Sequence, residues 1–329
     1  MTSLQLADRY GRVATDLRVS LTDRCNLRCA YCMPAEGLPW LPAETVLTDD
    51  EVCRLIRIAV GKLGVREVRF TGGEPLLRPG LEDIVRATSA LGVEVSLTTN
   101  GLGLSRRAVR LREAGLRRVN VSLDTLRPDR FVAIARRDRL VDVLRGLAAA
   151  RDAGLDPVKV NAVLLRDIND DEAVDLLAFC LDNGYQLRFI EQMPLDPMHS
   201  WDRSKMVTAQ EILDRLGCRW DLTAEERMDG APAQTFLIDG GPHQVGVIAS
   251  VTEPFCATCN RTRLTADGQV RNCLFAIEES DLRTALRNGA SDDELARRWQ
   301  LAMSVKAAGH GVDRVDFRQP ERAMSAIGG

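Results

Sequence analysis

The feature that most constrains the fold of this 329-residue chain is a regular alternation of strand-like and helical segments over its first two-thirds. Short runs of β-branched and apolar residues alternate with stretches of helical periodicity that often end at a glycine. Their spacing suits right-handed parallel crossovers. The pattern predicts six β/α units, with strands over 17–21, 67–71, 94–98, 118–123, 158–163 and 186–191 and helices over 48–63, 81–91, 105–114, 140–153 and 171–183.

Polar residues in these strands bear on whether the sheet is an open doubly wound sheet or an incomplete barrel. Buried parallel strands normally read as continuous apolar runs. Five of the predicted strands instead carry polar residues at alternate positions, which places each polar set on one face. A single such strand could face solvent, but five together are typical of an active site at the mouth of a barrel. We therefore expect an α/β fold, an incomplete (β/α)6 TIM-like barrel, whose polar set is Arg69, Thr71, Ser96, Thr98, Asn120, Ser122, Asp124, Lys159, Asn161 and Arg188.

The pattern changes after residue 191. Short strands and turns are expected over 192–275, a helix over 281–307, and an extended tail rich in glycine and small residues over 309–329. We expect two domains: a partial barrel over 1–191, and a C-terminal region over 192–329 that closes the open side of the barrel.

Composition narrows the class of protein. The formal net charge is −3, whereas a general nucleic-acid binder is usually basic because phosphate neutralisation supplies most of its affinity. No apolar run reaches the roughly 20 residues that span a bilayer, and residues 1–12 lack the apolar core of a secretory signal. We expect a cytoplasmic enzyme that binds neither nucleic acid nor membrane, and that holds any phosphorylated ligand with a few well-placed arginines.

The chain has nine cysteines, an odd number that cannot be fully paired, and the cytoplasm is reducing. Six of them form two tight groups of three. The other three, Cys53, Cys180 and Cys218, occur singly among apolar residues, and we expect them to be packed in the core.

The first group, Cys25, Cys29 and Cys32, follows the first predicted strand as C-x-x-x-C-x-x-C. A structural zinc site normally has four protein ligands, and an electron-transfer cluster normally has four cysteines. Three cysteines on a four-iron cluster leave one iron open to another ligand. This run, with an aromatic residue before its last cysteine, resembles the radical S-adenosylmethionine (SAM) superfamily.

Residues 71–75, TGGEP, follow the second predicted strand and resemble the GGEP motif of that superfamily, whose backbone contacts the methionine end of SAM. Glycines permit this close approach of the backbone. The resemblance implies a 4Fe-4S cluster on the first cysteine group and a SAM site formed by Tyr31, Gly73, Ser122 and Met193.

The second group comprises Cys256, Cys259 and Cys273, with the segment Arg261-Thr-Arg263 between the last two. Spacing alone favours a zinc site here, with His310 or Cys218 as a fourth ligand. Together, however, the two groups resemble the GTP 3′,8-cyclases (molybdenum cofactor biosynthesis protein A). The resemblance covers essentially the whole chain, through LTDRCNLRCAYCMP, RFTGGEPLLR, LTTNG, RVNVSLD, VKVNAVLL, EQMPLD, CNRTRLTADG and the terminal Gly328-Gly329.

This family resemblance implies a second 4Fe-4S cluster on Cys256, Cys259 and Cys273, which would bind the guanine of GTP. It implies that reductive cleavage of SAM yields a radical that removes the ribose 3′ hydrogen, after which C3′ bonds to C8 of guanine. The Gly-Gly tail would enter the active site. Arginine suits a triphosphate because its fork donates charge-assisted hydrogen bonds, and the implied GTP contacts are Arg18, Arg69, Thr98, Lys159, Arg188, Arg261 and Arg263.

The partners implied are GTP as substrate, an external electron donor, a downstream pterin-forming enzyme and, as an assembly to test, a homodimer. Two alternatives stay open from the residues alone. One is a radical SAM enzyme with an auxiliary cluster that acts on another substrate, such as a peptide. The other is a zinc-stabilised binding module.

Overall fold

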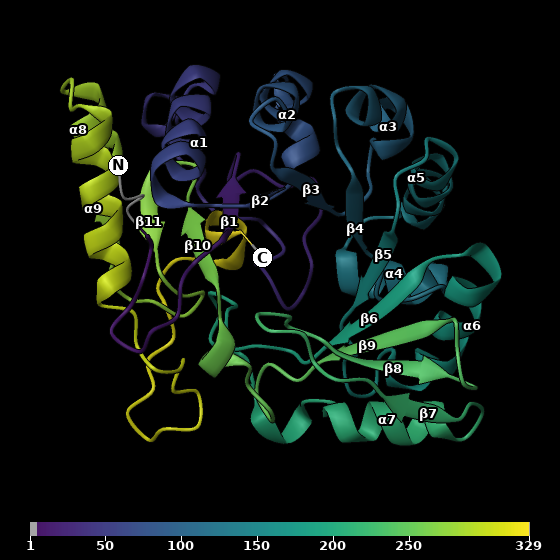
Figure 1. Ribbon diagram of the computed structural model, residues 1–329. Helices are drawn as coiled ribbons and strands as arrows, with labels where there is room; N and C mark the ends of the chain where they lie inside the picture. The colour runs from purple at the N-terminus through teal and green to yellow at the C-terminus, as the bar shows by residue number, and fades with distance from the viewer. Residues whose placement is uncertain (1–4, 329) are drawn as a thin grey trace.

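The computed structural model describes residues 5–328, and within them a twelve-stranded sheet curves through the molecule with helices on its outer side (Figure 1). The strands are β1 Asp16–Ser20, β2 Glu67–Thr71, β3 Glu94–Thr99, β4 Arg118–Ser122, β5 Val158–Ala162, β6 Gln186–Ile190, β7 Leu222–Ala224, β8 Gln234–Ile238, β9 Gln244–Ile248, β10 Arg261–Leu264, β11 Gln269–Arg271 and β12 Ser280–Asp281. The α-helices are α1 Asp49–Leu63, α2 Leu81–Ser89, α3 Leu104–Glu113, α4 Pro128–Ala135, α5 Leu140–Asp152, α6 Ala173–Asn183, α7 Ala209–Gly217, α8 Arg283–Arg287, α9 Asp292–Ser304 and α10 Met324–Ile327.

The predicted strands are confirmed to within a residue or so at each end, and β1 to β6 lie in sequence order and are parallel. The parallel run continues beyond them, because β9 pairs with the outer edge of β6 and β10 pairs with the outer edge of β1. Antiparallel strands β8 and β7 follow β9, and β11 and β12 follow β10. Residues after 191 therefore extend the sheet at both edges, which the sequence pattern did not predict.

Helix ends follow the capping rules that the sequence suggested. Thr48 caps α1 in a capping box with Glu51, in which each side chain accepts a hydrogen bond from the other residue's backbone N–H. Gly64 ends α1 in the left-handed conformation, at φ 76°. Thr208 and Glu211 form a second capping box at the start of α7. The predicted helices in the β/α region are confirmed to within two residues at each end, although α2, α3, α5 and α6 have no side-chain cap.

The C-terminal expectations need correction. The single helix predicted over 281–307 is two helices, α8 and α9, because Gly289 adopts φ 82° and Ser291 starts a new helix by accepting from the N–H of Glu294. The tail is not wholly extended, since it includes α10. The short helix α4, which begins at Pro128, was not predicted.

Side chains alternate along each strand between the two faces of the sheet. One face packs into the apolar core beneath the helices, and the other is polar and faces the interior of the curved sheet. In β2, Val68 and Phe70 are fully buried in the main apolar cluster, whereas Arg69 and Thr71 line a cavity on the other face. Figure 1 shows the C-terminal segment, in yellow, within the curve of the sheet beside β1 and β10. The fold thus collects the polar strand faces around an interior that the C-terminus enters.

The three single cysteines differ in exposure. Cys180 is buried as expected and Cys53 is half-buried, but Cys218 is exposed, so its predicted core position is wrong. Cys218 follows the last turn of α7, where its thiol donates to the carbonyl of Asp214 at 3.3 Å.

None of the helices in the described part of the chain is long and apolar enough to cross a membrane.

Candidate active site

The first cysteine group lies on a loop held against the TGGEP segment by backbone hydrogen bonds. The N–H of Gly73 donates to the carbonyl of Thr22, and the N–H of Glu74 donates to the carbonyl of Arg24, both at 2.7 Å. A Cβ on Gly73 would lie 2.3 Å from that Arg24 carbonyl oxygen. Glycine is therefore required at position 73 by the close approach of two backbones.

Glu74 stabilises the same loop from beneath. Its buried carboxyl accepts from the backbone N–H groups of Leu76 and Asn100 and from the hydroxyl of Thr99, at 2.7–2.9 Å. Burial raises its pKa to about 7 in spite of these hydrogen bonds. The side-chain amide of Asn100 lies 3.7 Å from Cys25 Sγ, so this network reaches the first cysteine group.

The cysteines of this group are half-buried, and their partial burial raises the pKa of Cys29 well above its ordinary value and that of Cys32 to about 12. A bound metal deprotonates such thiols, and a cluster would supply that stabilisation here. Among residues 5–328, no three His, Cys, Asp or Glu side chains converge on a single metal ion. In an iron–sulfur cluster each cysteine binds a different iron atom, so the three sulfur atoms do not need to point at one common centre.

A cavity of about 300 Å³ opens above the strand ends and is lined by all three of these cysteines. All four residues predicted to bind SAM line it as well: Tyr31, Gly73, Ser122 and Met193. The hydroxyl of Tyr31 donates to Asp124 Oδ2 at 2.7 Å. Burial raises the pKa of Asp124 to about 6, although it also accepts from the N–H of Val163.

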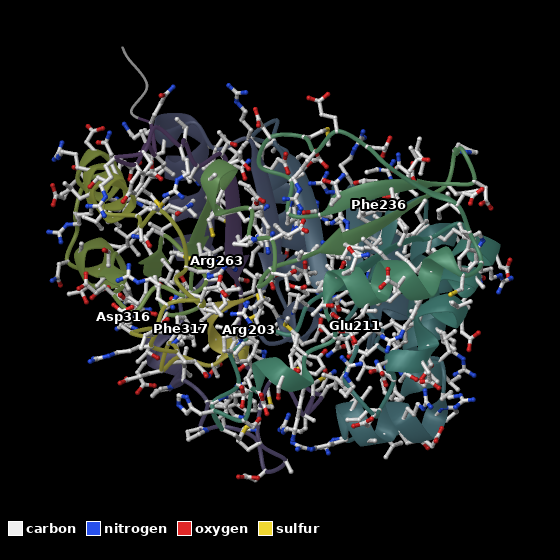
Figure 2. The ribbon with its side chains drawn as sticks, turned by 90° about the horizontal axis from the view of Figure 1, so that it is seen from below. Arg203, Glu211, Phe236, Arg263, Asp316 and Phe317 are labelled. Atoms are coloured by element: carbon white, nitrogen blue, oxygen red, sulfur yellow. The ribbon has the colours of Figure 1, made fainter. Side chains whose placement is uncertain are left out.

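Strand register aligns basic side chains on the cavity wall. Arg263 of β10 lies opposite Arg18 of β1, and Arg18 lies opposite Arg69 of β2. Arg261 lies one pleat earlier on β10, opposite Asp16, and its Nε is 3.6 Å from Asp16 Oδ2. Figure 2 shows Arg263 near the middle of the molecule.

Arg261 and Arg263 are buried, Arg18 and Arg69 are half-buried, and more positive than negative charge surrounds the four guanidiniums. Burial raises the pKa of Asp16, but the four arginines together hold it below the usual value. Burial, followed by repulsion from Arg69, lowers the pKa of Arg18 well below its ordinary range, and the Nε of Arg18 is buried without a hydrogen-bond partner among residues 5–328. A charged N–H that is shielded from water and has no partner is costly, so the wall suits an anionic ligand.

The remaining predicted GTP contacts divide into two sets. Arg188 and Thr98 line the cavity, and burial lowers the pKa of Arg188 to about 10. Lys159 does not line it, although it lies only two residues before the cavity residue Asn161 on β5. Burial, and then repulsion from Arg188, lowers the pKa of Lys159 to about 7.

The second cysteine group lies next to the cavity without lining it, since Phe255 and Leu274, the neighbours of Cys256 and Cys273, are in the lining and the cysteines are not. Its thiols are half-buried. Buried Lys306 donates to Cys259 Sγ at 3.3 Å and to the carbonyl of Arg261 at 3.0 Å. Burial alone would raise the pKa of Cys259, but Lys306 and Arg261 lower it to about 7. Arg261, stacked 4.9 Å from the ring centre of Phe255, connects this group to the cavity.

The C-terminal tail contacts both regions. The backbone N–H of Ser325 donates to the sulfur of Cys32, and Arg263 donates to the carbonyl of Gly328. A Cβ on Gly328 would lie 2.3 Å from Ser20 Oγ and 2.7 Å from Thr71 Cγ2. The tail thus lies between the first cysteine group and the arginine wall, while Gly329, the last residue of the predicted Gly-Gly motif, lies outside the described residues.

Sequence reasoning missed several residues of this site. Asp16 stands in an alternating polar pattern with Arg18, a signal that could have identified it. Asn100 follows the third strand within LTTNG, so its position was also visible in the sequence. Lys306 carried no such signal, because it ends an apolar helical segment far from the cysteines along the chain.

Comparison with known proteins agrees with this geometry. The Radical SAM superfamily model matches residues 19–180, and the Molybdenum Cofactor Synthesis C model matches residues 185–312. The structure of Streptococcus suis SuiB bound to S-adenosylmethionine aligns with 92% of this chain and 69% of that chain, with a TM-score of 0.60 at 14% identity. At that identity the likeness shows the fold alone. The family models and the fold together define a radical SAM protein.

Proteins of similar sequence identify the family within that superfamily. A GTP 3′,8-cyclase of Streptomyces coelicolor is 66% identical over 98% of this chain and 96% of that protein. One from Mycobacterium sp. strain KMS is 61% identical over 100% and 95%. The GTP 3′,8-cyclase 2 of Mycobacterium tuberculosis strain CDC 1551 is 58% identical over 100% and 93%. The chain belongs to the GTP 3′,8-cyclase family.

Replacing Gly73 with alanine tests the contact between the two loops. The added Cβ meets the Arg24 carbonyl, and overpacking of this kind costs about 1–3 kcal/mol. We expect a lower urea midpoint and less iron bound after anaerobic reconstitution. Gly61→Ala in α1 is the control, because no atom lies within 4 Å of its added Cβ, and it should be neutral or stabilising by about 0.5–1 kcal/mol. Equal behaviour of the two variants would contradict the assigned contact.

Proposed function

We propose that this protein is a GTP 3′,8-cyclase, which converts GTP to (8S)-3′,8-cyclo-7,8-dihydroguanosine 5′-triphosphate in the first step of molybdenum cofactor biosynthesis. The observation that carries the proposal is the arginine wall, which lines the same cavity as the first cysteine group and includes Arg261, a neighbour of Cys259 in the second group. The family membership agrees with it.

We propose that Cys25, Cys29 and Cys32 hold one 4Fe-4S cluster, with SAM bound beside it in the same cavity. When bound, the cluster and SAM supply the one-electron chemistry that abstracts hydrogen from the substrate. The chain contributes position and exclusion of water. Tyr31, Gly73, Ser122 and Met193 are the proposed SAM contacts, supported by their place in the cavity lining.

The triphosphate is assigned to the arginine wall. GTP carries several negative charges, and the paired N–H groups of a guanidinium fit phosphate oxygens. Binding would also offset the burial and the repulsion from neighbouring arginines that lower the pKa values of Arg18, Arg69 and Arg263 in the free protein. We propose as contacts Arg18, Arg69, Thr98, Lys159, Arg188, Arg261 and Arg263.

A second 4Fe-4S cluster is proposed on Cys256, Cys259 and Cys273. Cys259 suits a ligand role because the neighbouring cations of Lys306 and Arg261 favour its thiolate. Arg261 reaches both this group and the cavity, so guanine bound at the second cluster and phosphates bound at the wall can belong to one molecule.

The proposed architecture is an incomplete (β/α)6 barrel over 1–191 with a C-terminal region over 192–329 that covers its open side and carries the Gly-Gly tail. The parallel order of β1 to β6 supports the first part. The proposed partners are GTP, an external electron donor, a downstream pterin-forming enzyme and a second copy of the chain as a homodimer, in the cytoplasm.

A second candidate keeps radical SAM chemistry but takes another substrate, such as a peptide. The arginine wall favours GTP over it, because a triphosphate carries several negative charges in one compact group, whereas the carboxylates of a peptide are single charges on separate side chains. Anaerobic incubation with SAM, a reductant and GTP separates the candidates. The cyclic dihydro-GTP should accumulate together with deoxyadenosine, and ATP in place of GTP should give none. Deoxyadenosine formed without consumption of GTP would refute the cyclase proposal.

Lys159 gives a prediction about pH. Its pKa of about 7 leaves it mostly neutral at pH 8 in the free protein, and a bound triphosphate favours its charged form. GTP binding should therefore take up close to one proton at pH 8, and affinity should fall as pH rises above 7. Calorimetry of the anaerobic holoenzyme in buffers of different ionisation enthalpy measures this uptake.

The matched control is Lys159→Arg, whose guanidinium is charged throughout this range. It should bind GTP with little proton uptake. Identical uptake by the wild type and this variant would remove Lys159 from the proposed GTP site.

A further inference from the structure

A groove lined by arginines lies on the outside of the molecule, on the far side of the first cysteine loop from the cavity. Its basic residues are Arg106, Arg107 and Arg110 of α3, and Arg137 and Arg139 of the segment between α4 and α5. Among the described residues, Asp142 is the one carboxylate in its lining. Leu76, Leu77 and Leu102 give it an apolar floor, and Leu77 is 43% exposed. We call this surface the basic groove.

Intramolecular pairing neutralises only part of the basic groove. Glu82 pairs with Arg107 and lies 3.6 Å from Arg110. Asp142 pairs with Arg139 at 3.0 Å. Arg106 and Arg137 are exposed, and neither forms an ion pair within the described part of the chain. The groove is therefore positive on a chain whose formal net charge is −3.

The groove also approaches the first cysteine group closely. Asn26, the neighbour of Cys25, lines the groove. Its side-chain carbonyl accepts from Asn100 Nδ2 at 2.8 Å, and the same Nδ2 lies 3.7 Å from Cys25 Sγ. One pair of asparagine side chains thus separates the groove from a thiol of the first group. The cavity, by contrast, is assigned to SAM and GTP and is partly filled by the C-terminal tail.

We propose that the basic groove is the docking surface for a small, acidic one-electron carrier protein. The carrier would be oxidised by one electron, which enters the group held by Cys25, Cys29 and Cys32 by way of Asn26 and Asn100. Positive charge in the groove attracts and orients the acidic carrier, which the negative remainder of the chain repels. The exposed leucine floor supplies the apolar centre that a transient interface needs. This inference rests on the proposed function, since it requires a reducible first cluster.

The test compares two reductants with the anaerobic holoenzyme, SAM and GTP. One is an acidic flavodoxin in its reduced form, which must dock. The other is reduced methyl viologen, a small cation that needs no docking surface. In the variant Arg106→Glu/Arg137→Glu, kcat/KM for flavodoxin at low salt should fall roughly tenfold or more, the range of electrostatic steering. Turnover with methyl viologen should stay at the wild-type level.

The matched control is Arg297→Glu/Arg298→Glu. It makes the same change in charge on exposed positions of α9, which packs at the β11–β12 end of the sheet, whereas α3 lies near the middle of the sheet (Figure 1). It should retain flavodoxin-driven turnover. Raising the salt concentration should weaken flavodoxin-driven turnover of the wild type and have little effect on the groove variant.

The outcomes separate the two proposals. If the wild type makes no cyclised product with methyl viologen, the proposed function fails. If it does, and the groove variant keeps wild-type flavodoxin kinetics or the control loses them equally, the docking proposal is overturned. An RNA duplex that binds the wild type but not the groove variant, with flavodoxin kinetics unchanged, would assign the groove to a nucleic acid instead.

Discussion

The parallel pairing of β10 with β1 is the interaction on which the site depends. It joins residues 16–19 to residues 261–264 in one register, although they are far apart along the chain. Arg263 and Arg18 become neighbours only through this pairing, and Cys259, two residues before Arg261, is brought next to the same wall. Buried Trp299 of α9 supports the pair from outside, because its indole N–H donates to Thr262 of β10 at 2.9 Å.

The resulting wall concentrates positive charge in a buried place. Stability alone would not favour this arrangement, because removing an unpaired ion from water costs several kcal/mol even after relaxation. Asp16 neutralises part of the charge, and the carbonyl of Gly328 accepts from Arg263. The rest of the compensation would come from a bound anion, so the repulsion in the free protein and the triphosphate site proposed here have one cause. The tail occupies the space between this wall and the first cysteine group.

Much of the fold followed from local patterns. Capping residues, terminal glycines and alternating strands located the six β/α units, and the polar alternation along the strands indicated which face is the inner one. The predicted SAM residues all line one cavity. The added strands β9 and β10 were not predictable in the same way, because β10 pairs with a strand far away in sequence, and β9 follows its partner β6 only after α7 and the antiparallel strands β7 and β8. The break in the last predicted helix, by contrast, has a local cause, Gly289, that was visible in the sequence.

The site was predictable where it follows motifs and less so where it depends on tertiary contacts. Cysteine spacing and the R-T-R segment located both groups, whereas Lys306 meets Cys259 only through packing. Cys218, expected in the core, proved exposed because it lies just beyond the end of an amphipathic helix. Lys159 shows a further limit of prediction from sequence. Alternation along its strand assigned Lys159 to the inner face of the sheet but could not show whether its side chain lines the cavity.

The central claim is that each three-cysteine group holds its own four-iron cluster, the first in the cavity lined by the arginine wall and the second next to that cavity. Elemental analysis of anaerobically reconstituted wild type, Cys32→Ala and Cys273→Ala tests it most directly. The account predicts about eight iron atoms per wild-type chain, about four in each variant, and no stoichiometric zinc. Zinc at either group in place of iron, or a single variant that loses all the iron, would contradict it.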